Sequence, residues 1–246
     1  MRLALFADIH GNREAFEACL RDARARGCDR TVILGDCVGY GADPAWVVDQ
    51  VMALVAAGSV AVLGNHDRAV GDAREALGAD AETAMAWTRG QLGVDARRFL
   101  AGLPLQAEEE GRLYVHASVP PGRRWPYLDG PEAAGRALQA CRAQAVFCGH
   151  VHIPALYSLT AAGQTIAFHP VPGARIPLLR HRRWLAVLGS VGQPRDGQTA
   201  AGYALLDLAL GELTFLRVPY DVRAAAAKIR AAGLPRSLAD RLEGGR

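Results

Sequence analysis

The sequence lacks the segments that a membrane-spanning or secreted protein needs. Its 246 residues contain no apolar run of about 18 residues, so we expect no membrane-spanning helix. The apolar start of the chain, residues 1–6, is too short for the core of a signal peptide, and Asp8 and His10 follow it closely. We therefore expect a cytoplasmic protein that does not associate with membranes.

Cysteine is scarce and is not arranged in pairs. The chain has five cysteines, at positions 19, 28, 37, 141 and 148. None of them forms a Cys-x-x-Cys pair, and the odd number does not fit a disulfide framework. This usage is typical of reduced, mostly buried thiols in a cytosolic protein.

The charge pattern offers no tract for binding nucleic acid. There are 28 basic and 25 acidic residues, Lys228 is the only lysine, and no run of Lys or Arg is longer than two. Apolar residues make up 50% of the chain and charged residues 22%, which is ordinary for a globular protein and excludes a disordered chain or a coiled coil. Since we find no linker, we interpret residues 1–246 as a single domain.

The first half of the sequence alternates apolar runs with helical patterns. The expected strands are 3–7, 31–34, 60–63, 113–115 and 145–148, and the expected helices are 13–26, 44–57 and 131–142. Asn12 is the expected cap of the first helix. Residues 72–101 are expected to be helical, with Asp80 and Asp95 as caps. Strand–helix–strand order of this kind predicts parallel pairing with right-handed crossovers.

The pattern changes after Pro154. The expected strands there are 156–159, 165–168, 184–188, 203–207 and 213–218, followed by a helix over 221–232. Gly163-Gln164 and Gly211-Glu212 are expected hairpin turns. These strands predict a second, more antiparallel sheet, and residues 170–183 are the expected long exposed loop.

Five of the seven histidines lie in short motifs directly after predicted strands. The motifs are Asp8-Ile9-His10, Gly35-Asp36, Gly64-Asn65-His66-Asp67, His116 and Gly149-His150-Val151-His152. Ligands of open α/β sheets gather beyond the carboxyl ends of the strands, so these motifs are expected to meet at one edge. Any one of them alone is more often a cap, a turn or a packed residue, and only the ordered set argues for a site.

The chemistry of this set indicates a metal site. Carboxylate, amide and imidazole ligands without thiolate suit Mn, Fe, Zn, Ni, Co or Mg better than a structural zinc cage. Residues i and i+2 of an extended chain point the same way, so we expect Asp8 and His10 to reach one ion. Glycines 35, 64 and 149 are expected to let the backbone turn sharply before each ligand.

The ordered motifs resemble the signature set of the calcineurin-like metallophosphoesterase superfamily over residues 3–154. Residues 35–41 and 189–197 further resemble its bacterial predicted-phosphodiesterase branch. The resemblance implies an α/β fold, a four-layer α/β/β/α sandwich in which two mixed β-sheets face each other. It also implies a site for two divalent metal ions, of the set named above, between the sheets.

The resemblance also implies a role for each residue. Asp8, His10 and His152 would hold one metal, and Asn65, His116 and His150 the other, with Asp36 bridging the two. His66 would touch the phosphate and protonate the leaving oxygen, and Asp67 would orient His66. Two such ions, about 3.5–4 Å apart, share a hydroxide that attacks the phosphate ester in line.

The substrate is less well defined than the chemistry. The Ser/Thr phosphatases of the superfamily carry an Arg soon after Gly-Asp, where this chain has Val38-Gly39-Tyr40, which argues against phosphoprotein monoesters as substrates. Phosphodiester cleavage is slightly favoured over monoester cleavage. Small phosphate esters, nucleotides among them, are the expected substrates. Loops 68–95, 117–130 and 170–183 are expected to rim the site. Candidate contacts, each also open to a purely structural interpretation, are Arg68 and Arg195 for phosphate and Trp87, Trp125 and Tyr127 for a base.

Other functions remain as alternatives. One is a phosphomonoesterase acting on nucleotides or other small molecules, and another is a non-catalytic binding module of the same fold. The complete ligand set and His66 argue against the binding module. An amidohydrolase barrel would place its His-x-His at the first strand, whereas here it lies at 150–152. Strand one is not followed by the glycine motif of a dinucleotide-binding fold, and Ser190 lacks the nucleophile elbow of a serine hydrolase.

Overall fold

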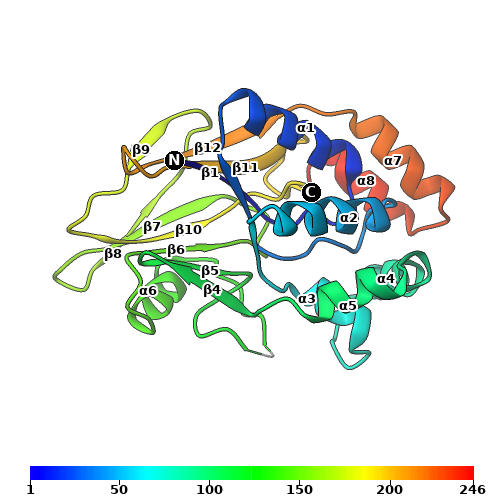
Figure 1. The fold of residues 1–246 in the computed structure, drawn as a ribbon, viewed down its shortest axis with the longest axis horizontal. Helices are drawn as coiled ribbons and strands as arrows, with labels where there is room; N and C mark the ends of the chain where they lie inside the picture. Colours follow the sequence, from blue (N-terminus) through cyan, green and yellow to red (C-terminus); the bar gives the residue numbers. More distant parts are fainter. Residues whose placement is uncertain (123) are drawn as a thin grey trace.

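Two mixed sheets of six strands each form the centre of the computed structural model, which describes residues 1–122 and 124–246 (Figure 1). The first sheet has the order β3 (Val60–Ala61), β2 (Arg30–Ile33), β1 (Arg2–Phe6), β11 (Ala201–Asp207), β12 (Glu212–Val218) and β9 (Arg175–Pro177). The second has the order β4 (Gln106–Glu109), β5 (Arg112–Val115), β6 (Ala145–Cys148), β10 (Arg183–Val187), β7 (Ala155–Leu159) and β8 (Thr165–Phe168). Parallel pairs join β1, β2 and β3 in the first sheet and β5, β6 and β10 in the second, and the other neighbours are antiparallel.

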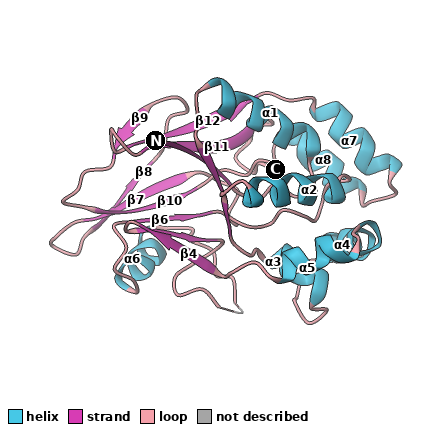
Figure 2. Ribbon diagram, in the orientation of Figure 1, coloured by secondary structure: helices cyan, strands magenta, loops and turns pink. Residues whose placement is uncertain are grey.

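Helices cover the outer faces of both sheets (Figure 2). The helices associated with the first sheet are α1 (Arg13–Ala25), α2 (Pro44–Ala56), α7 (Val222–Ala231) and α8 (Arg236–Gly244). The second sheet is covered by α6 (Pro131–Gln139), which contacts β7, β8 and β10. A further group, α3 (Asn65–Gly71), α4 (Ala79–Gln91) and α5 (Val94–Ala101), packs against α2.

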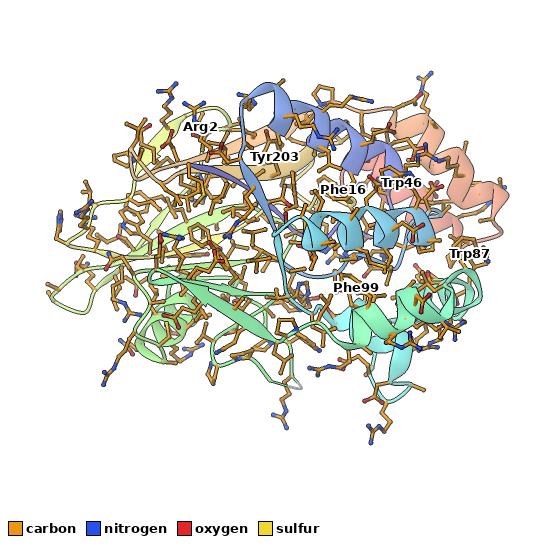
Figure 3. The ribbon with its side chains drawn as sticks, in the orientation of Figure 1. Arg2, Phe16, Trp46, Trp87, Phe99 and Tyr203 are labelled. Carbon is orange, nitrogen blue, oxygen red and sulfur yellow. The ribbon has the colours of Figure 1, made fainter. Side chains whose placement is uncertain are left out.

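Alternating side chains of β1 divide the core into layers. Leu3 and Leu5 face the second sheet and share a buried cluster with Phe147. Phe6 points the other way, toward α1, where its ring meets the ring of Phe16 edge-on with centroids 5.6 Å apart. Figure 3 shows Phe16 and Trp46 between α1 and α2. The four-layer α/β/β/α sandwich predicted from the sequence is therefore confirmed.

Several local signals act as predicted. The Asn12 side chain caps α1 by accepting a hydrogen bond from the Ala15 N–H at 3.1 Å. Gly163 and Gly211 join β7 to β8 and β11 to β12, and both have a positive φ, which glycine adopts without strain. We further propose that residues 1–246 form one domain, because α7 packs against α1 and β11 pairs with β1.

The strands after Pro154 do not form a sheet of their own, contrary to the sequence-based expectation. Strands β7, β8 and β10 extend the sheet of β6, whereas β9, β11 and β12 extend the sheet of β1. The hairpin turns fix pairing within each hairpin, but they do not specify which open sheet edge a hairpin joins.

The expected helical region 72–101 is also different in detail. Its first helix, α3, already begins at Asn65, and α4 and α5 follow a non-helical stretch over 72–78. The N-caps of α4 and α5 are Gly78 and Gly93 rather than Asp80 and Asp95. The two aspartates lie in the first turns, where a negative charge favours the helix dipole.

Two short strands were not predicted from the sequence. The strand β4 is rich in charged residues, and β9 lies inside the predicted loop 170–183, where it pairs with β12. Neither strand has an apolar alternation that a sequence pattern reveals. No helix in the described part of the chain is long and apolar enough to cross a membrane.

Candidate metal centre

The predicted ligands meet at one edge of the two facing sheets. Asp8 and His10 follow β1, Asp36 follows β2, and the other four come after β3, β5 and β6. The remaining predicted ligands are Asn65, His116, His150 and His152. All seven are buried, with at most 8% of any residue exposed. Residues more than a hundred positions apart thus form one polar cluster in an otherwise apolar interior.

The cluster contains three groups of side chains that could hold an ion, and the one formed by His10, Asp36 and His66 links the other two. Asp8, His10 and His152 have one ligand atom each, and these atoms lie within 4.8 Å of one another. Asp36, His116 and His150 form a second group by the same measure. The Asp36 Oδ2 atom lies 3.7 Å from the His10 Nε2 atom and 3.4 Å from the His116 Nε2 atom, so it stands between the two groups.

The backbone conformation of the ligands differs from the extended one that we expected. Asp8 and His10 have φ values of 55° and 50°, and Asp36, His150 and His152 also have positive φ. The left-handed conformation is costly for these residue types, and such strain gathers at functional sites. Asp8 and His10 therefore converge because the chain turns at both, and not because they alternate along a strand.

Two of the three motif glycines matter because a carboxylate packs directly against them, and not because the backbone turns sharply there. Only Gly35 has a positive φ among the three, at 81°. A Cβ atom on Gly64 would lie 2.2 Å from the Asp36 Oδ1 atom, and one on Gly149 would lie 2.4 Å from the Asp8 Oδ2 atom. Side chains at these two positions would displace the carboxylates.

Backbone carbonyls fix the tautomers of the histidines. The Nδ1–H groups of His10, His116 and His152 donate to the carbonyl oxygens of Val38, Leu34 and Gln193, at 3.1, 2.7 and 2.6 Å. A carbonyl can only accept, so each neutral ring keeps its Nε2 lone pair for the site. His150 is reversed, because its Nε2–H donates to the Trp125 carbonyl at 3.0 Å and leaves Nδ1 bare.

This arrangement of acceptors fits a cation. With those tautomers, the Nε2 atoms of His10 and His152 are both acceptors, yet they face each other at 3.1 Å. The carboxylates of Asp8 and Asp36 lie within 4.0 Å of the same nitrogens. Two buried acceptors that face each other beside carboxylates are unfavourable unless a donor or a metal lies between them. The donor set therefore fits divalent ions held by oxygen and nitrogen.

The electrostatics of the cluster favour ionised carboxylates. Burial raises the pKa of Asp8, but the neighbouring His152 outweighs it and brings the pKa to about 2. Burial likewise opposes ionisation of Asp36, but His116 and His66 hold its pKa well below the usual range. Burial lowers the pKa of His116, but Asp36 raises it overall to about 9. In the metal-free protein both carboxylates are therefore ionised, and His116 carries a proton beside Asp36 that a bound cation would displace.

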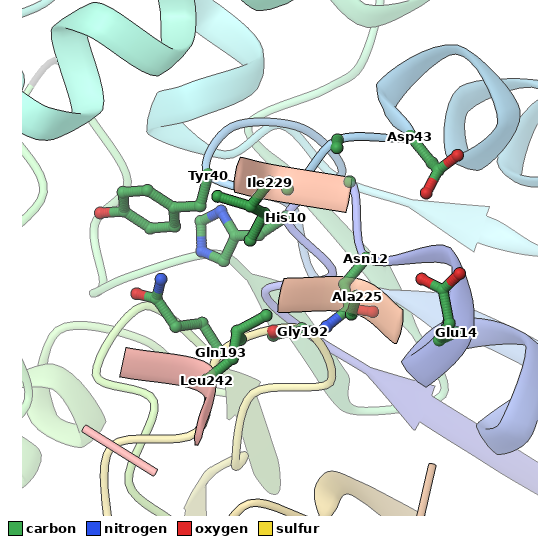
Figure 4. A pocket seen from close by; sticks show the side chains of 13 residues that line it. His10, Asn12, Glu14, Tyr40, Asp43, Gly192, Gln193, Ala225, Ile229 and Leu242 are labelled. Carbon is green, nitrogen blue, oxygen red and sulfur yellow. Dashed lines mark hydrogen bonds between the residues drawn. The ribbon is translucent and has the colours of Figure 1, made fainter. Parts of the chain in front are cut away.

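His66 lies beside these groups without an anchoring partner. Its ring meets that of His10 at 4.8 Å and that of Tyr40 at 4.6 Å, and its buried Nδ1 atom has no hydrogen-bond partner. Figure 4 shows the His10 and Tyr40 rings side by side, with Gln193 extending toward them. Gly39 lies against His66 so closely that a Cβ atom there would be 2.3 Å from Nδ1.

Asp67 has a different role from the one predicted. Its carboxylate accepts hydrogen bonds from the backbone N–H groups of Cys37, Val38 and Gly64, at 2.8, 3.3 and 3.1 Å. No hydrogen bond joins it to the His66 ring in the described part of the chain. We therefore correct the prediction that Asp67 orients His66: it ties the Asp36 loop to the start of α3. Burial and the charge of Asp36 raise the pKa of Asp67 to about 7.

The segment 189–193 supports the site in a way that was not predicted from the sequence. The Ser190 hydroxyl donates to the Asp8 carbonyl at 2.7 Å, and the Gly192 N–H donates to the same oxygen at 2.9 Å. The Gln193 carbonyl accepts from His152. The Gly-Ser-Val-Gly motif was visible in the sequence, but only the fold shows that it lies behind the ligands.

A cavity of about 390 Å³ opens over the cluster. Its lining includes Asp36, Asn65 and His66 on the floor and residues 75–78 on one side. Loops 68–95 and 117–130 contribute to the rim as predicted, although position 123 of the second loop lies outside the described residues. The prediction for loop 170–183 is wrong, since no described residue of it lines the cavity and its strand β9 lies at the far edge of the first sheet.

Some of the predicted rim residues support the cavity wall or pack elsewhere, and others line the cavity itself. Arg68 lies 4.5 Å from the centre of the Trp125 ring, and Trp125 donates a hydrogen bond to Glu75 at 2.8 Å, so Arg68 supports the wall. Trp87 belongs to α4, packs against a buried cluster that includes residues of α7 and α8, and does not line the cavity (Figure 3). Trp125, Tyr127 and Arg195 do line it. The Tyr127 ring stacks on His150 at 4.4 Å and is 52% exposed.

Comparison with known proteins agrees with this geometry. Residues 1–211 match the family model of the calcineurin-like phosphoesterase superfamily domain. An uncharacterized protein of Methanocaldococcus jannaschii is 33% identical over 250 residues, which cover 99% of this chain and 98% of that protein. The crystal structure of a metallophosphoesterase from Sphaerobacter thermophilus is 34% identical, with a TM-score of 0.88 over 100% of this chain and 99% of that one.

A more distant structure shares the fold. The crystal structure of a hypothetical protein from Pyrococcus horikoshii OT3 is 21% identical and has a TM-score of 0.80, over 100% of this chain and 98% of that one. The family match covers most of the chain, and the two relatives cover almost all of it. The chain belongs to the calcineurin-like phosphoesterase superfamily and is a metal-dependent phosphoester hydrolase.

Proposed function

We propose that this protein is a dinuclear metal phosphoesterase that prefers phosphodiesters. The observation that carries the proposal is the position of Asp36 between two ligand groups, with Oδ2 within 4.0 Å of a histidine of each. Asp8, His10 and His152 would hold one ion, and Asn65, His116 and His150 the other, with Asp36 shared. Any of Mn, Fe, Zn, Ni, Co or Mg suits these ligands.

Each group in the cavity has a part in this activity. When bound, divalent ions supply Lewis acidity toward the phosphate and lower the pKa of a water molecule. The carbonyls of Val38 and Gln193 pre-set the Nε2 atoms of His10 and His152 as lone-pair donors. The carbonyl of Leu34 does the same for His116 once its Nε2 proton has left, so binding needs no tautomer change. The positive φ of the ligands is compatible with a rigid, strained support for this arrangement.

His66 is the proposed acid for the leaving oxygen. Burial lowers the pKa of His66, so its ring is neutral at neutral pH in the free protein. An anionic phosphate next to the ring favours the protonated form, which can then pass its proton to the departing oxygen. Because Nδ1 has no partner, ring position depends on packing against Tyr40, His10 and Gly39.

The shape of the cavity favours a substrate with groups on both sides of the phosphate. Its lining includes Trp125 and Tyr127, which pack against His116 and His150, and also Tyr40 and Arg195, which contact each other. A diester extends in both directions, whereas a monoester uses only one.

The five free thiols are consistent with a reducing cytoplasm, which is the compartment we propose.

A comparison of reloaded metal forms tests the proposal. Metal-free protein would be loaded separately with each of the six metals and given bis-p-nitrophenyl phosphate or p-nitrophenyl phosphate. We expect metal-dependent release of nitrophenolate that is faster from the diester. Faster release from the monoester would make the protein a phosphomonoesterase. Two bound ions without turnover of either ester would favour a binding module.

A further inference from the structure

The cavity over the predicted metal ligands, here called the inner cavity, continues into a second, outer cavity. The outer cavity has a volume of about 580 Å³ and shares Tyr40, Tyr127 and Arg195 with the inner cavity. Gly78 and Ala81 also line both. The two cavities therefore form one groove, which leads from Asp36 and His66 toward the helices α4 and α8. The buried residues Ala84 of α4 and Leu238 of α8 pack in one cluster.

The outer part of the groove is positively charged. Its lining contains Arg195, Arg241 and Arg246 against a single carboxylate, that of Asp80. The Arg241 guanidinium approaches Asp80 only to 3.7 Å, and its side chain is 40% exposed. No ion pair holds Arg195 or Arg246 in the described part of the chain. Arg195 donates only to neutral groups, the Tyr40 hydroxyl and the Gln193 side-chain oxygen, each at 3.4 Å. Among the residues that the structure describes, no side-chain carboxylate therefore neutralises Arg195 or Arg246.

The inner end of the groove already binds one phosphate in the proposed function. A second cluster of cationic groups at the outer end has no role in cleaving that phosphate. Arginine matches phosphate with paired N–H donors, and a cleft with walls of one charge concentrates ligands of the opposite charge. The rings of Tyr40 and Tyr127 lie between the two ends and offer a surface for an apolar or planar linking group.

We infer that Arg195, Arg241 and Arg246 form a subsite for a second phosphoryl group of the substrate. The substrate class is then a phosphate ester with two phosphoryl groups, one cleaved at the metal cluster and one held by these arginines. This inference rests on the proposed function, since it takes the metal cluster as the point of cleavage. It adds the requirement of a second phosphoryl group on the substrate, which cleavage at the predicted metal centre alone does not impose.

Bisphosphates of defined length test the subsite. Manganese-loaded protein would be titrated by calorimetry with alkane-1,n-diol bisphosphates of two to eight carbons and with the matching monoalkyl phosphates. The same compounds would be tested as inhibitors of bis-p-nitrophenyl phosphate hydrolysis. At the best length we expect the bisphosphate to bind about tenfold more tightly than its monophosphate.

Single arginine variants identify the groups responsible. Arg241→Gln and Arg246→Gln should each reduce that preference severalfold, and their thermal unfolding would verify that they fold. The matched control is Arg142→Gln, at an exposed position outside both cavities, which should keep the full preference. A preference that survives both groove variants would overturn the inference, as would equal binding of bisphosphate and monophosphate at every length.

The two possible failures are distinguishable. Calorimetry reports binding without turnover, so a protein that hydrolyses no ester with any metal but keeps the arginine-dependent preference contradicts the proposed function alone. A protein that hydrolyses the diester but shows no preference for bisphosphates contradicts the subsite alone.

Discussion

Replacing Gly39 by alanine would disturb His66 without touching any proposed ligand. Gly39 has a φ of 91°, and a Cβ atom there would lie 2.3 Å from the His66 Nδ1 atom. An ordinary contact is about 3.4 Å or longer, so the imidazole must move by roughly 1 Å. Because His66 has no hydrogen bond at Nδ1, only packing resists that movement.

The expected effects on stability and on rate follow from the backbone strain at position 39 and from the displacement of the His66 ring. A left-handed φ costs alanine about 1–2 kcal/mol relative to glycine, which lowers the melting temperature of a chain this long by about 2–8 °C. A displacement of about 1 Å at a reacting group costs roughly a hundredfold in rate. We expect Gly39→Ala to keep its metals and to lose about a hundredfold in kcat with alkyl phosphate esters. The loss should be smaller with p-nitrophenyl esters, whose leaving group needs little protonation.

Gly58 provides the matched control. Its φ is 96°, but a Cβ atom there would meet nothing within 4 Å. Gly58→Ala should therefore lose similar stability through backbone strain and keep its full kcat. Steady-state kinetics, metal analysis and thermal unfolding of both variants complete the test. Equal kcat values for the two variants would refute the role of His66, and loss of metal from Gly39→Ala would mean that the glycine supports the ligands instead.

Three further predictions concern single side chains. Asp36→Asn should lower metal content and reduce activity by orders of magnitude, measured by metal analysis and diester hydrolysis; full activity at wild-type metal content would contradict the bridging role. His66→Gln should keep the metals and slow turnover, least for nitrophenyl esters; loss of metal would make His66 a ligand. Although burial opposes it, hydrogen bonds from Arg26 and Tyr203 lower the pKa of Asp22, so its stabilising effect is present above the unfolded pKa near 4 and is lost as the pH falls further. Asp22→Asn should therefore lower the melting temperature at pH 7, and the difference from wild type should shrink below pH 4; a constant difference would contradict this.

The metal-centre motifs were readable from the sequence because strand ends and ligand chemistry are local features. The family, the four-layer fold and the helix cap at Asn12 were all predicted correctly. The structure brings Asp8, Asp36 and His116 together as expected, although ligation itself stays a prediction. Periodicity and residue type carry this information within short stretches.

Features that depend on distant segments were not predicted. No local pattern shows that β11 would join β1, or that the Gln193 carbonyl would meet His152. Two of the three partners of Asp67, the N–H groups of Cys37 and Val38, come from another motif, and a sequence cannot reveal them. The positive φ values of the ligands are likewise imposed by tertiary contacts, which override the intrinsic preference of Asp and His.

The spin coupling of bound manganese tests the central claim most directly. Metal-free protein would be titrated with Mn²⁺ and followed by electron paramagnetic resonance, with Asp36→Asn as the comparison. If Asp36 joins two sites, wild type binds two ions per chain and shows the spectrum of a coupled pair, which the variant loses. One ion per chain, or two ions that remain uncoupled in the wild type, would contradict the account.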